Sequence, residues 1–207
     1  MGDNVRKLRC YINYDKEEQW LNDMAQKGYE LEDVCIGYKF HSVDCENTII
    51  KIDYRTFLKK SDFIDYCTLF EDSGWTHIAG SKNSGTQYFK KIDGNSDDDI
   101  FSDKVSKSGK YKRLSDMWLG IGVAYLPLYS VLISTGAIDA NSIFHPKLLY
   151  LTPGLWEKTG ADFLGAFLFE TPFALMRGFS WSIILLVIIL AFCFALKANK
   201  LYKKGIK

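Results

Sequence analysis

The hydrophobic positions of this chain follow two different patterns. Before residue 93 they either alternate with polar positions in short stretches, as in half-buried strands, or recur with helical spacing. After residue 113 they form two long runs, at 114–138 and 179–197, and each is close to the ~20 residues that a helix needs to cross a bilayer. The pattern therefore predicts an α+β head followed by an α-helical transmembrane hairpin.

The head begins with an alternating stretch, Leu8–Ile12, that predicts a strand. Asp15 and Glu18 have the spacing of a capping box, which predicts the start of a helix. Gly28 is expected to close this helix in a left-handed conformation, and two extended segments, 29–36 and 38–40, follow it. The helix carries an apolar stripe made of Trp20, Leu21, Met24 and Ala25.

The same order of elements returns in the second half of the head. A shift of 46 residues places Gly28 on Gly74, and Ser61 is in a position to cap the second helix. Units of ~45 residues bury little core alone, so the two are expected to share one sheet. We predict a duplicated βαββ, ferredoxin-like domain over residues 1–92, with repeats at about 5–46 and 47–92. Both helices would lie on one face of an antiparallel sheet.

Lysine and arginine gather just before the first apolar run and just after the second, and these flanks predict the topology. Short basic flanks stay in the cytoplasm, so both termini are expected inside and residues 139–178 outside. A basic tail follows at 198–207. We predict a membrane collar made of Lys104, Lys107, Lys110, Lys112, Arg113, Lys197, Lys200, Lys203 and Lys204.

Residues 93–113 are expected to be an acidic linker followed by a basic juxtamembrane segment. Asp93–Asp99 begins like a calcium loop, but Asp98 stands where the turn needs glycine, so a solvated linker is the better interpretation. Residues 100–113 suit either a passive linker or a short amphipathic helix on the inner leaflet, with a hinge at Gly109. Within the outer segment, residues 161–176 are apolar but carry charges and a proline, which favours an interfacial or re-entrant segment over a third span.

Charge separates the head from the membrane part. Residues 1–103 contain 13 basic and 20 acidic residues, a net charge of −7, whereas 104–113 and 179–207 each carry +5. An acidic head argues against nucleic acid as a partner, because phosphate binding needs clustered cations. The basic collar instead suits anionic membrane lipid.

The chemistry of catalysis and metal binding is missing from the sequence pattern. No pair of the five cysteines has C-x-x-C spacing, so reduced cysteines are expected and no metal site or cofactor is predicted. Neither His41 nor His77 has a nucleophile or carboxylate in a recognisable catalytic order, and no glycine pattern fits a phosphate loop. The chain is therefore predicted not to be an enzyme.

Aromatic residues concentrate on the predicted sheet and at the helix ends. Core packing explains them, because aromatic side chains favour strands and cores. A groove at the junction of the two repeats, for an apolar ligand or a partner's helix, is the alternative. The candidate groove residues are Trp20, Tyr29, Tyr38, Tyr54, Trp75 and Tyr88.

The stretch Glu17–Leu31 resembles the opening of a bacterial domain-of-unknown-function family of small two-helix membrane proteins. Further matching segments are Tyr38–Phe40, Ile52–Tyr54, Phe70–Trp75, Tyr88–Lys91, Ile100–Asp103 and Tyr111–Arg113. The resemblance covers roughly residues 5–113. It implies that the gene often lies beside one for a PadR-type transcriptional repressor, and hence a repressor-controlled response to envelope stress.

These patterns predict a non-enzymatic regulatory or sensory membrane protein. Its cytoplasmic head would bind an unidentified protein partner or a small ligand, and the oligomeric state, a homo-oligomer included, stays open. The alternative is a small transporter-accessory or immunity protein that acts through its transmembrane hairpin. Deleting residues 1–103 distinguishes the two, because only the alternative tolerates loss of the head.

Overall fold

The computed structural model describes residues 5–43, 48–92, 98–137 and 140–207. Cys45 and most of the predicted acidic linker, residues 93–97, lie outside the described residues. The chain divides into two compact units. The first contains residues 1–116 and 196–207, and the second contains residues 117–195.

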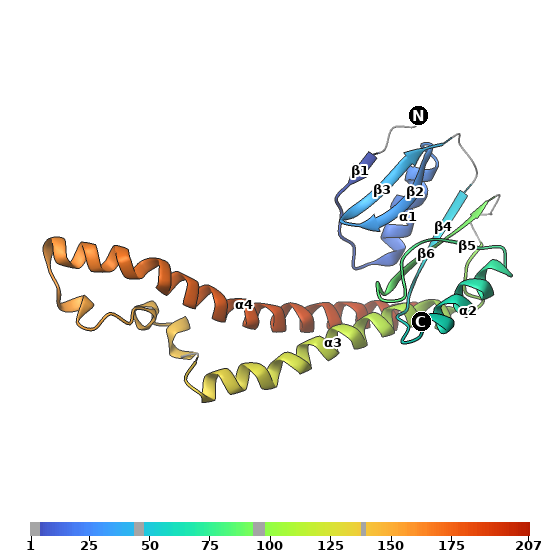
Figure 1. The fold of residues 1–207 in the computed structure, drawn as a ribbon. Helices are drawn as coiled ribbons and strands as arrows, with labels where there is room; N and C mark the ends of the chain where they lie inside the picture. Colours follow the sequence, from blue (N-terminus) through green and yellow to red (C-terminus); the bar gives the residue numbers. More distant parts are fainter. Residues whose placement is uncertain (1–4, 44–47, 93–97, 138–139) are drawn as a thin grey trace. The chain divides into compact units, whose positions relative to one another are not determined.

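The head has the element order strand, helix, strand, strand in each of its halves (Figure 1). The first half contains β1 Val5–Lys7, α1 Tyr14–Ala25, β2 Tyr29–Cys35 and β3 Gly37–Ser42. The second contains β4 Thr48–Tyr54, α2 Lys60–Glu71, β5 Thr76–Ala79 and β6 Thr86–Ile92. A shift of 46 residues carries α1 onto α2 at both ends.

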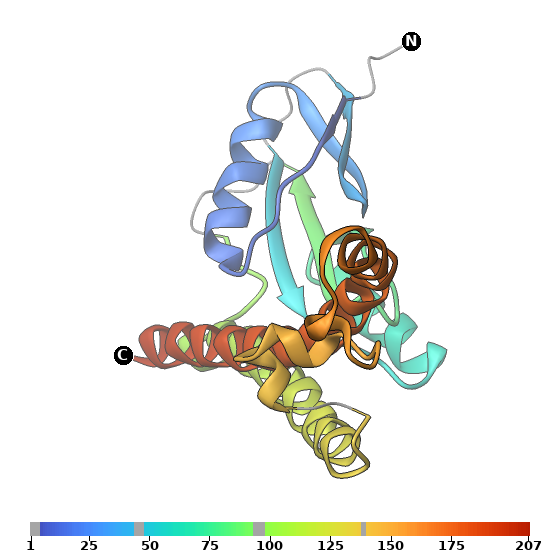
Figure 2. The ribbon, with the colours of Figure 1, turned by 90° about the vertical axis from the view of Figure 1, so that its left-hand side faces the viewer.

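The strands form two antiparallel sheets of three strands each, whereas we predicted one shared sheet. The orders are β1-β3-β2 and β4-β6-β5, so the third strand of each half lies in the middle. β4 pairs with β6 over its whole length, from Thr48 opposite Ile92 to Tyr54 opposite Thr86. Among the described residues, no strand pairs with its other edge. Helix α1 lies along β4 as well as β2, so it contacts both sheets (Figure 2).

The helices end as predicted but begin elsewhere. Gly28 and Gly74 have φ of 79° and 81°, the left-handed conformation expected after each helix. The first helix starts one residue before Asp15, because Asn13 is the N-cap and its side chain accepts from the Asp15 and Lys16 N–H groups. The second starts at Lys60, so Ser61 lies inside the helix and is not its cap.

Each half of the head packs its helix through apolar and aromatic side chains. Leu21 and Met24 of α1 are buried, and the Trp20 ring meets Phe40 edge-on with centroids 5.7 Å apart. On the other helix, Tyr66 and Phe70 join the buried core of the second sheet. That core consists of Ile49, Tyr66, Phe70, Trp75 and Phe89.

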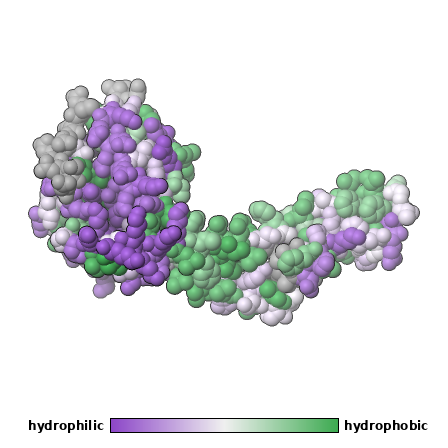
Figure 3. All heavy atoms as spheres, turned by 180° about the vertical axis from the view of Figure 1, so that it is seen from behind, coloured by the Kyte–Doolittle hydropathy of each residue, from purple (hydrophilic) through white to green (hydrophobic). Residues whose placement is uncertain are grey.

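Two helices are long enough and apolar enough to cross a membrane, α3 Lys104–Ser134 and α4 Gly160–Ile206. Many of their large apolar side chains are exposed to the surroundings (Figure 3). Two apolar helices were predicted, but their bounds differ: α3 begins ten residues before the predicted span 114–138 and ends earlier, at Ser134, whereas α4 extends beyond 179–197 at both ends. α3 begins in the basic segment and passes Gly109 and Pro127 without a break, and α4 includes the segment 161–176 that we expected to be interfacial.

In the second unit, short 3-10 turns pack against α4. These are η1 Ala140–Ile143, η2 Pro146–Leu149 and η3 Leu155–Glu157. The Tyr150 ring stacks on Phe167 with centroids 5.3 Å apart, and Glu170 accepts hydrogen bonds from the Leu151 N–H and from the Thr152 hydroxyl. α3 and α4 also meet in this unit, where Trp118 contacts Phe194.

Candidate functional site

The free edge of β4 is covered by polar side chains. Because β6 pairs with only one side of β4, the N–H and C=O groups on the other side need different partners. Asn22 of α1 satisfies both groups of Ile50. Its Oδ1 accepts from the Ile50 N–H at 2.7 Å, and its Nδ2 donates to the Ile50 carbonyl at 3.3 Å. One side-chain amide thus replaces a neighbouring strand.

Glu18 and Lys110 continue this edge at Ile52. The Ile52 N–H donates to Glu18 Oε1 at 3.1 Å. Lys110 Nζ donates to the same oxygen at 2.7 Å and to the Ile52 carbonyl at 3.3 Å. Lys110 is 1% exposed and Glu18 7%, so the pair is shielded from water. Removing one partner of such a pair is strongly destabilising, and α1, β4 and α3 are therefore fastened together here.

Arg113 and Asp53 form a second ion pair one turn further along α3. Arg113 Nε donates to the Tyr54 carbonyl, and its Nη2 donates to Asp53 Oδ1. The other Asp53 oxygen accepts from the Tyr66 hydroxyl of α2 at 2.9 Å. Asp53 is 1% exposed, so its carboxylate links β4, α2 and α3 inside the head. We refer to Glu18, Asp53, Lys110 and Arg113 together as the α3 junction.

Tyr111 adds an aromatic contact to the α3 junction. Its hydroxyl donates to Asn13 Oδ1 at 3.0 Å and accepts from the Asp15 N–H at 3.1 Å, so it supports the cap of α1. Its ring stacks on Tyr14 with centroids 5.6 Å apart, and Tyr14 in turn stacks on Tyr54. Burial raises the pKa of Tyr111, which stays neutral at physiological pH.

Glu17, next to the α3 junction, joins the two sheets. Its Oε1 accepts hydrogen bonds of 2.7 Å from the Tyr38 hydroxyl of β3 and from the Tyr88 hydroxyl of β6. Burial raises the pKa of Glu17 above its ordinary value, and the two hydroxyl donors only partly offset this effect. Ionisation of Glu17 in the core therefore costs stability.

The positions of Glu17 and Glu18 follow from the helical repeat. They precede Leu21 by four and three residues, so they lie on the same face as the apolar stripe. The sequence pattern assigned Glu18 to a capping box with Asp15, gave Glu17 no role, and did not predict that either side chain is an interior group. The available signal was the presence of two carboxylates on the face of α1 that packs against the core, since such groups need a buried partner. The partner Lys110 lies 92 residues away from Glu18, and no local pattern identifies it.

A cleft of about 440 Å³ opens beside Asp53 and Arg113. Small-molecule sites commonly have volumes of about 300–1,000 Å³ with apolar walls and a few polar groups. This cleft has that mixture, since Arg55 and the two junction residues accompany apolar side chains. The apolar part of its lining comes from Tyr66, Leu69 and Phe70 of α2 and from Ile100 and Phe101. These last two belong to the segment 98–103 just before α3, which we call the connecting segment.

The six aromatic residues predicted to line a groove are not brought together. Trp20 and Tyr38 contact each other in the first half, with ring centroids 4.8 Å apart. Tyr54 stacks on Tyr14, and Trp75 belongs to the core of the second sheet. Tyr88 points to Glu17. Tyr38, Tyr54, Trp75 and Tyr88 are buried, which is the placement expected of core residues.

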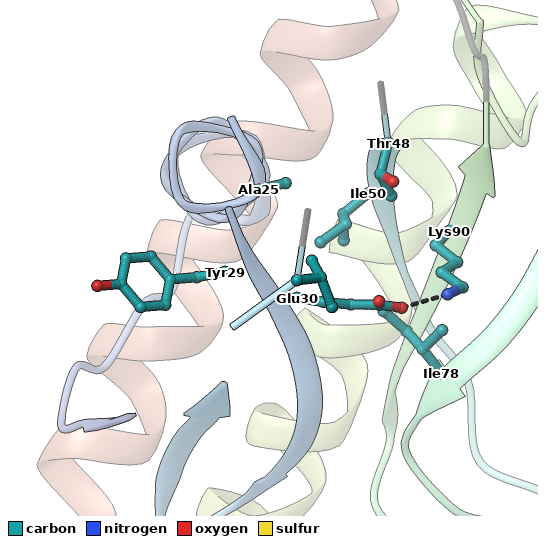
Figure 4. Close-up of a pocket in the computed structure, with 8 residues that line it drawn as sticks. Ala25, Tyr29, Glu30, Thr48, Ile50, Ile78 and Lys90 are labelled. Atoms are coloured by element: carbon teal, nitrogen blue, oxygen red, sulfur yellow. Dashed lines mark hydrogen bonds and ion pairs between the residues drawn. The ribbon is translucent and has the colours of Figure 1, made fainter. Parts of the chain in front are cut away.

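Only Tyr29 of those six lines the small cavity where the two sheets approach each other (Figure 4). The ion pair between Glu30 of β2 and Lys90 of β6 closes one side, and Ile50 and Ile78 lie on the other sides. The cavity has a volume of about 10 Å³, which is room for about one water molecule. It is too small for the apolar ligand or helix that the predicted groove would hold.

The predicted membrane collar is divided by the structure. Lys110 is withdrawn into the head and Arg113 is half-buried, so the prediction that Lys110 contacts lipid is corrected: Glu18 provides it with a buried partner. Lys107 is bonded to Asp99, which raises the pKa of the lysine. The collar residues that remain exposed are Lys104, Lys112, Lys197, Lys200, Lys203 and Lys204.

The remaining candidate chemistry lies apart from the α3 junction. His77 shares a hydrogen bond of 3.0 Å with Gln87, and burial lowers its pKa. His41 lies 3.6 Å from Glu30. Within residues 5–43, 48–92, 98–137 and 140–207, no three His, Cys, Asp or Glu side chains are grouped closely enough to hold a metal ion.

The fold and the α3 junction define a small α+β domain fastened to the first of two long apolar helices. Residues 13–123 match the model of a family described as a protein of unknown function, DUF2812, and the chain belongs to this family. The match includes α1, the strands of the second sheet and all four residues of the α3 junction. No curated protein and no solved structure matches the chain.

Proposed function

We propose that this chain is a non-enzymatic regulatory or sensory protein that passes twice through the cell membrane, with both termini in the cytoplasm. Its head binds a protein partner or a small ligand, and α3 and α4 anchor it. One observation supports this proposal above the others: the α3 junction fastens α3 to the head through Lys110 and Arg113. The same helix continues without a break into the apolar run.

This arrangement suits the transfer of a signal. Regulation across two sites needs two states that both sites influence, not mere tethering. An occupant of the cleft beside Asp53 and Arg113 would touch α2, the connecting segment and α3 together. Such an occupant would act directly on the contacts that position α3. A passive linker offers no comparable path.

The family resemblance adds two finer elements to the proposal. A PadR-type repressor encoded beside the gene would control expression of the protein during envelope stress. The two halves of the head would be products of an internal duplication. The equal order of elements and the 46-residue offset of α1 and α2 support the duplication.

The regulatory role is tested by affinity purification of the intact, tagged chain from native membranes. Mass spectrometry then identifies co-purifying proteins and small molecules. We expect the intact chain to retain a protein or small molecule that does not co-purify with a chain lacking residues 1–103. An occupant retained equally by that shortened chain would support the alternative, a transporter-accessory or immunity protein that acts through the hairpin.

A matched pair of leucine variants tests whether the cleft is the binding site. Leu69 lines the cleft and is 63% exposed, whereas Leu58 is 95% exposed and lies outside it. We expect Leu69→Gln to reduce recovery of the occupant and Leu58→Gln to leave it unchanged. Both substitutions replace an exposed apolar side chain, so stability changes should stay within about 0.5 kcal/mol. Equal recovery of the bound partner or ligand from both variants would exclude the cleft as its binding site.

A further inference from the structure

A second hollow, of about 370 Å³, lies where the start of α3 meets the end of α4, and both segments belong to the first unit. Four lysines line it: Lys104 and Lys107 of α3, and Lys204 and Lys207 of α4. These residues are separated by about 100 positions in the sequence, so their convergence is a property of the fold. It differs from a run of basic residues beside a membrane span.

Most of this positive charge has no acidic partner. Lys107 is bonded to Asp99, but no described carboxylate lies within ion-pair distance of Lys104, Lys204 or Lys207. One carboxylate, Asp15, also lines the hollow, and it lies 3.6 Å from the Lys110 ammonium. The hollow therefore carries a net positive charge that the protein leaves unbalanced.

Two small residues explain how lysines from both helices reach one hollow. Gly205 of α4 lies against Ser108 of α3, and a Cβ added at Gly205 would lie 2.2 Å from the serine Oγ. Real Cβ atoms essentially never come this close, so a larger residue at 205 requires either the Ser108 side chain or one of the helices to shift. Ser108 is 3% exposed, and its hydroxyl donates to the Lys104 carbonyl. The hollow is thus a consequence of the close crossing.

We propose that this hollow binds a phosphate group. Several ammonium groups that converge from different elements, without carboxylate partners, match the charge and oxygen-rich surface of a phosphate ester. The proposal does not depend on whether the head has a regulatory role. Binding in this hollow also differs from a general attraction of the membrane collar to lipid, because it requires the lysines that line the hollow and not the exposed lysines beside them.

The phosphate group can belong to a lipid head group or to a soluble molecule. Lys104 precedes Leu114, the first residue of the apolar run, by ten helical residues, which is ~15 Å along the axis. Lys204 follows Leu196 by eight residues, ~12 Å. Each polar layer of a bilayer is only ~5–8 Å thick, so a lipid would have to extend its head group toward the hollow. Both sources are tested below.

The test uses the full chain in nanodiscs and two charge-matched double variants. Lys104→Gln with Lys204→Gln removes one lysine of the hollow from each helix. Lys112→Gln with Lys203→Gln removes one exposed lysine from each helix outside the hollow. In phosphatidylcholine nanodiscs, calorimetry measures binding of inorganic phosphate. In nanodiscs with equal amounts of phosphatidylglycerol and phosphatidylcholine, native mass spectrometry counts retained phosphatidylglycerol.

We expect the first double variant to bind about 30-fold more weakly in at least one arm, since each cation near an anionic group contributes about 1 kcal/mol, which is about fivefold in affinity. The second should lose less than about threefold. Binding of inorganic phosphate supports a soluble ligand, and retention of phosphatidylglycerol alone supports a lipid. Equal losses in both variants, or no binding in either arm, would overturn the proposal.

Gly205→Val provides a variant that keeps every charge. It should weaken binding in the same arm, because the valine side chain separates α4 from Ser108 and disperses the lysines. Thermal unfolding of the same sample shows whether the chain remains folded. Unchanged binding in a folded Gly205→Val protein would show that the close crossing is not needed, and would contradict a defined site.

Discussion

Replacing Lys110 by methionine tests the α3 junction most sharply among single substitutions. The variant loses the ammonium that donates to Glu18 Oε1 at 2.7 Å and to the Ile52 carbonyl at 3.3 Å. The Glu18 carboxylate would then remain buried with the Ile52 N–H as its hydrogen-bond donor. Breaking a buried pair in this way costs about 3–5 kcal/mol. Lys51, 3.9 Å from Glu18 Oε2, offsets part of this, so the lower end is expected.

A loss of about 3 kcal/mol corresponds to a fall in melting temperature of about 12 °C, at about 4 °C per kcal/mol. The assay is thermal unfolding of the full chain in detergent, and tryptophan fluorescence monitors the unfolding. Lys112→Met is the matched control, because Lys112 is exposed two residues further along α3, and its change should stay within about 0.5 kcal/mol.

A double variant shows whether the loss comes from the buried charge. Adding Glu18→Gln to Lys110→Met removes the uncompensated carboxylate and keeps an oxygen for the Ile52 N–H. The double variant should therefore be more stable than Lys110→Met alone. Equal melting temperatures of Lys110→Met and Lys112→Met, or strictly additive effects of Glu18→Gln and Lys110→Met, would refute the reasoning.

Three further predictions concern the core and the topology. Burial raises the pKa of Glu17 above 4.5, so the head loses stability as the pH rises from 4.5 through the pKa of the folded state. Glu17→Gln should therefore have a higher melting temperature than the unchanged chain at pH 7, and this difference should shrink toward pH 4. An unchanged margin would contradict a buried, ionised Glu17. Trp75→Ala should cost about 3–5 kcal/mol in thermal unfolding, and Trp20→Ala less, because Trp20 is only half-buried. Equal losses would contradict this placement. In a cysteine-free background, an impermeant maleimide should label Asn141→Cys but not Lys207→Cys on intact cells; the reverse would exclude the proposed orientation.

The elements of the head could largely be predicted from sequence, because they follow from local patterns. Alternation placed the first strand too late, at Leu8–Ile12, whereas β1 is Val5–Lys7. Gly28 and Gly74 correctly marked the helix ends where a left-handed conformation is needed. The helix starts were less accurate, since Asn13 competes with Asp15 as a cap and both residue types suit that role. The two long apolar helices were evident from composition alone.

The division into two sheets could not be predicted, because it depends on contacts between distant residues. Alternation shows which face of β4 is buried, but not whether its edge meets another strand. That edge is occupied by side chains of Asn22, Glu18 and Lys110, which come from α1 and α3. The same reasoning explains the error about Lys110. Five basic residues in ten predict a membrane flank, and the charge rule does not identify the one that turns toward the head.

The aromatic residues illustrate a second limit. The four tyrosines of the predicted groove do lie on strands, whereas Trp20 lies within α1 and Trp75 precedes β5. A linear pattern does not separate a groove from a core. In the structure Tyr38 and Tyr88 point their hydroxyls at Glu17, so two of the candidate groove residues serve a buried carboxylate. The cleft beside Asp53 and Arg113 instead uses residues from α2 and from the segment after the second sheet.

The central claim is that the head encloses the start of α3, and the reactivity of single lysines measures this most directly. The full chain in nanodiscs is treated briefly with an acetylating reagent, and mass spectrometry compares Lys110 with Lys112. Lys110 is 1% exposed and paired, whereas Lys112 is exposed. If opening the pair costs about 3 kcal/mol, Lys110 should react on the order of 100-fold more slowly than Lys112. Equal rates at Lys110 and Lys112 would contradict the account, since both lysines would then belong to an open collar.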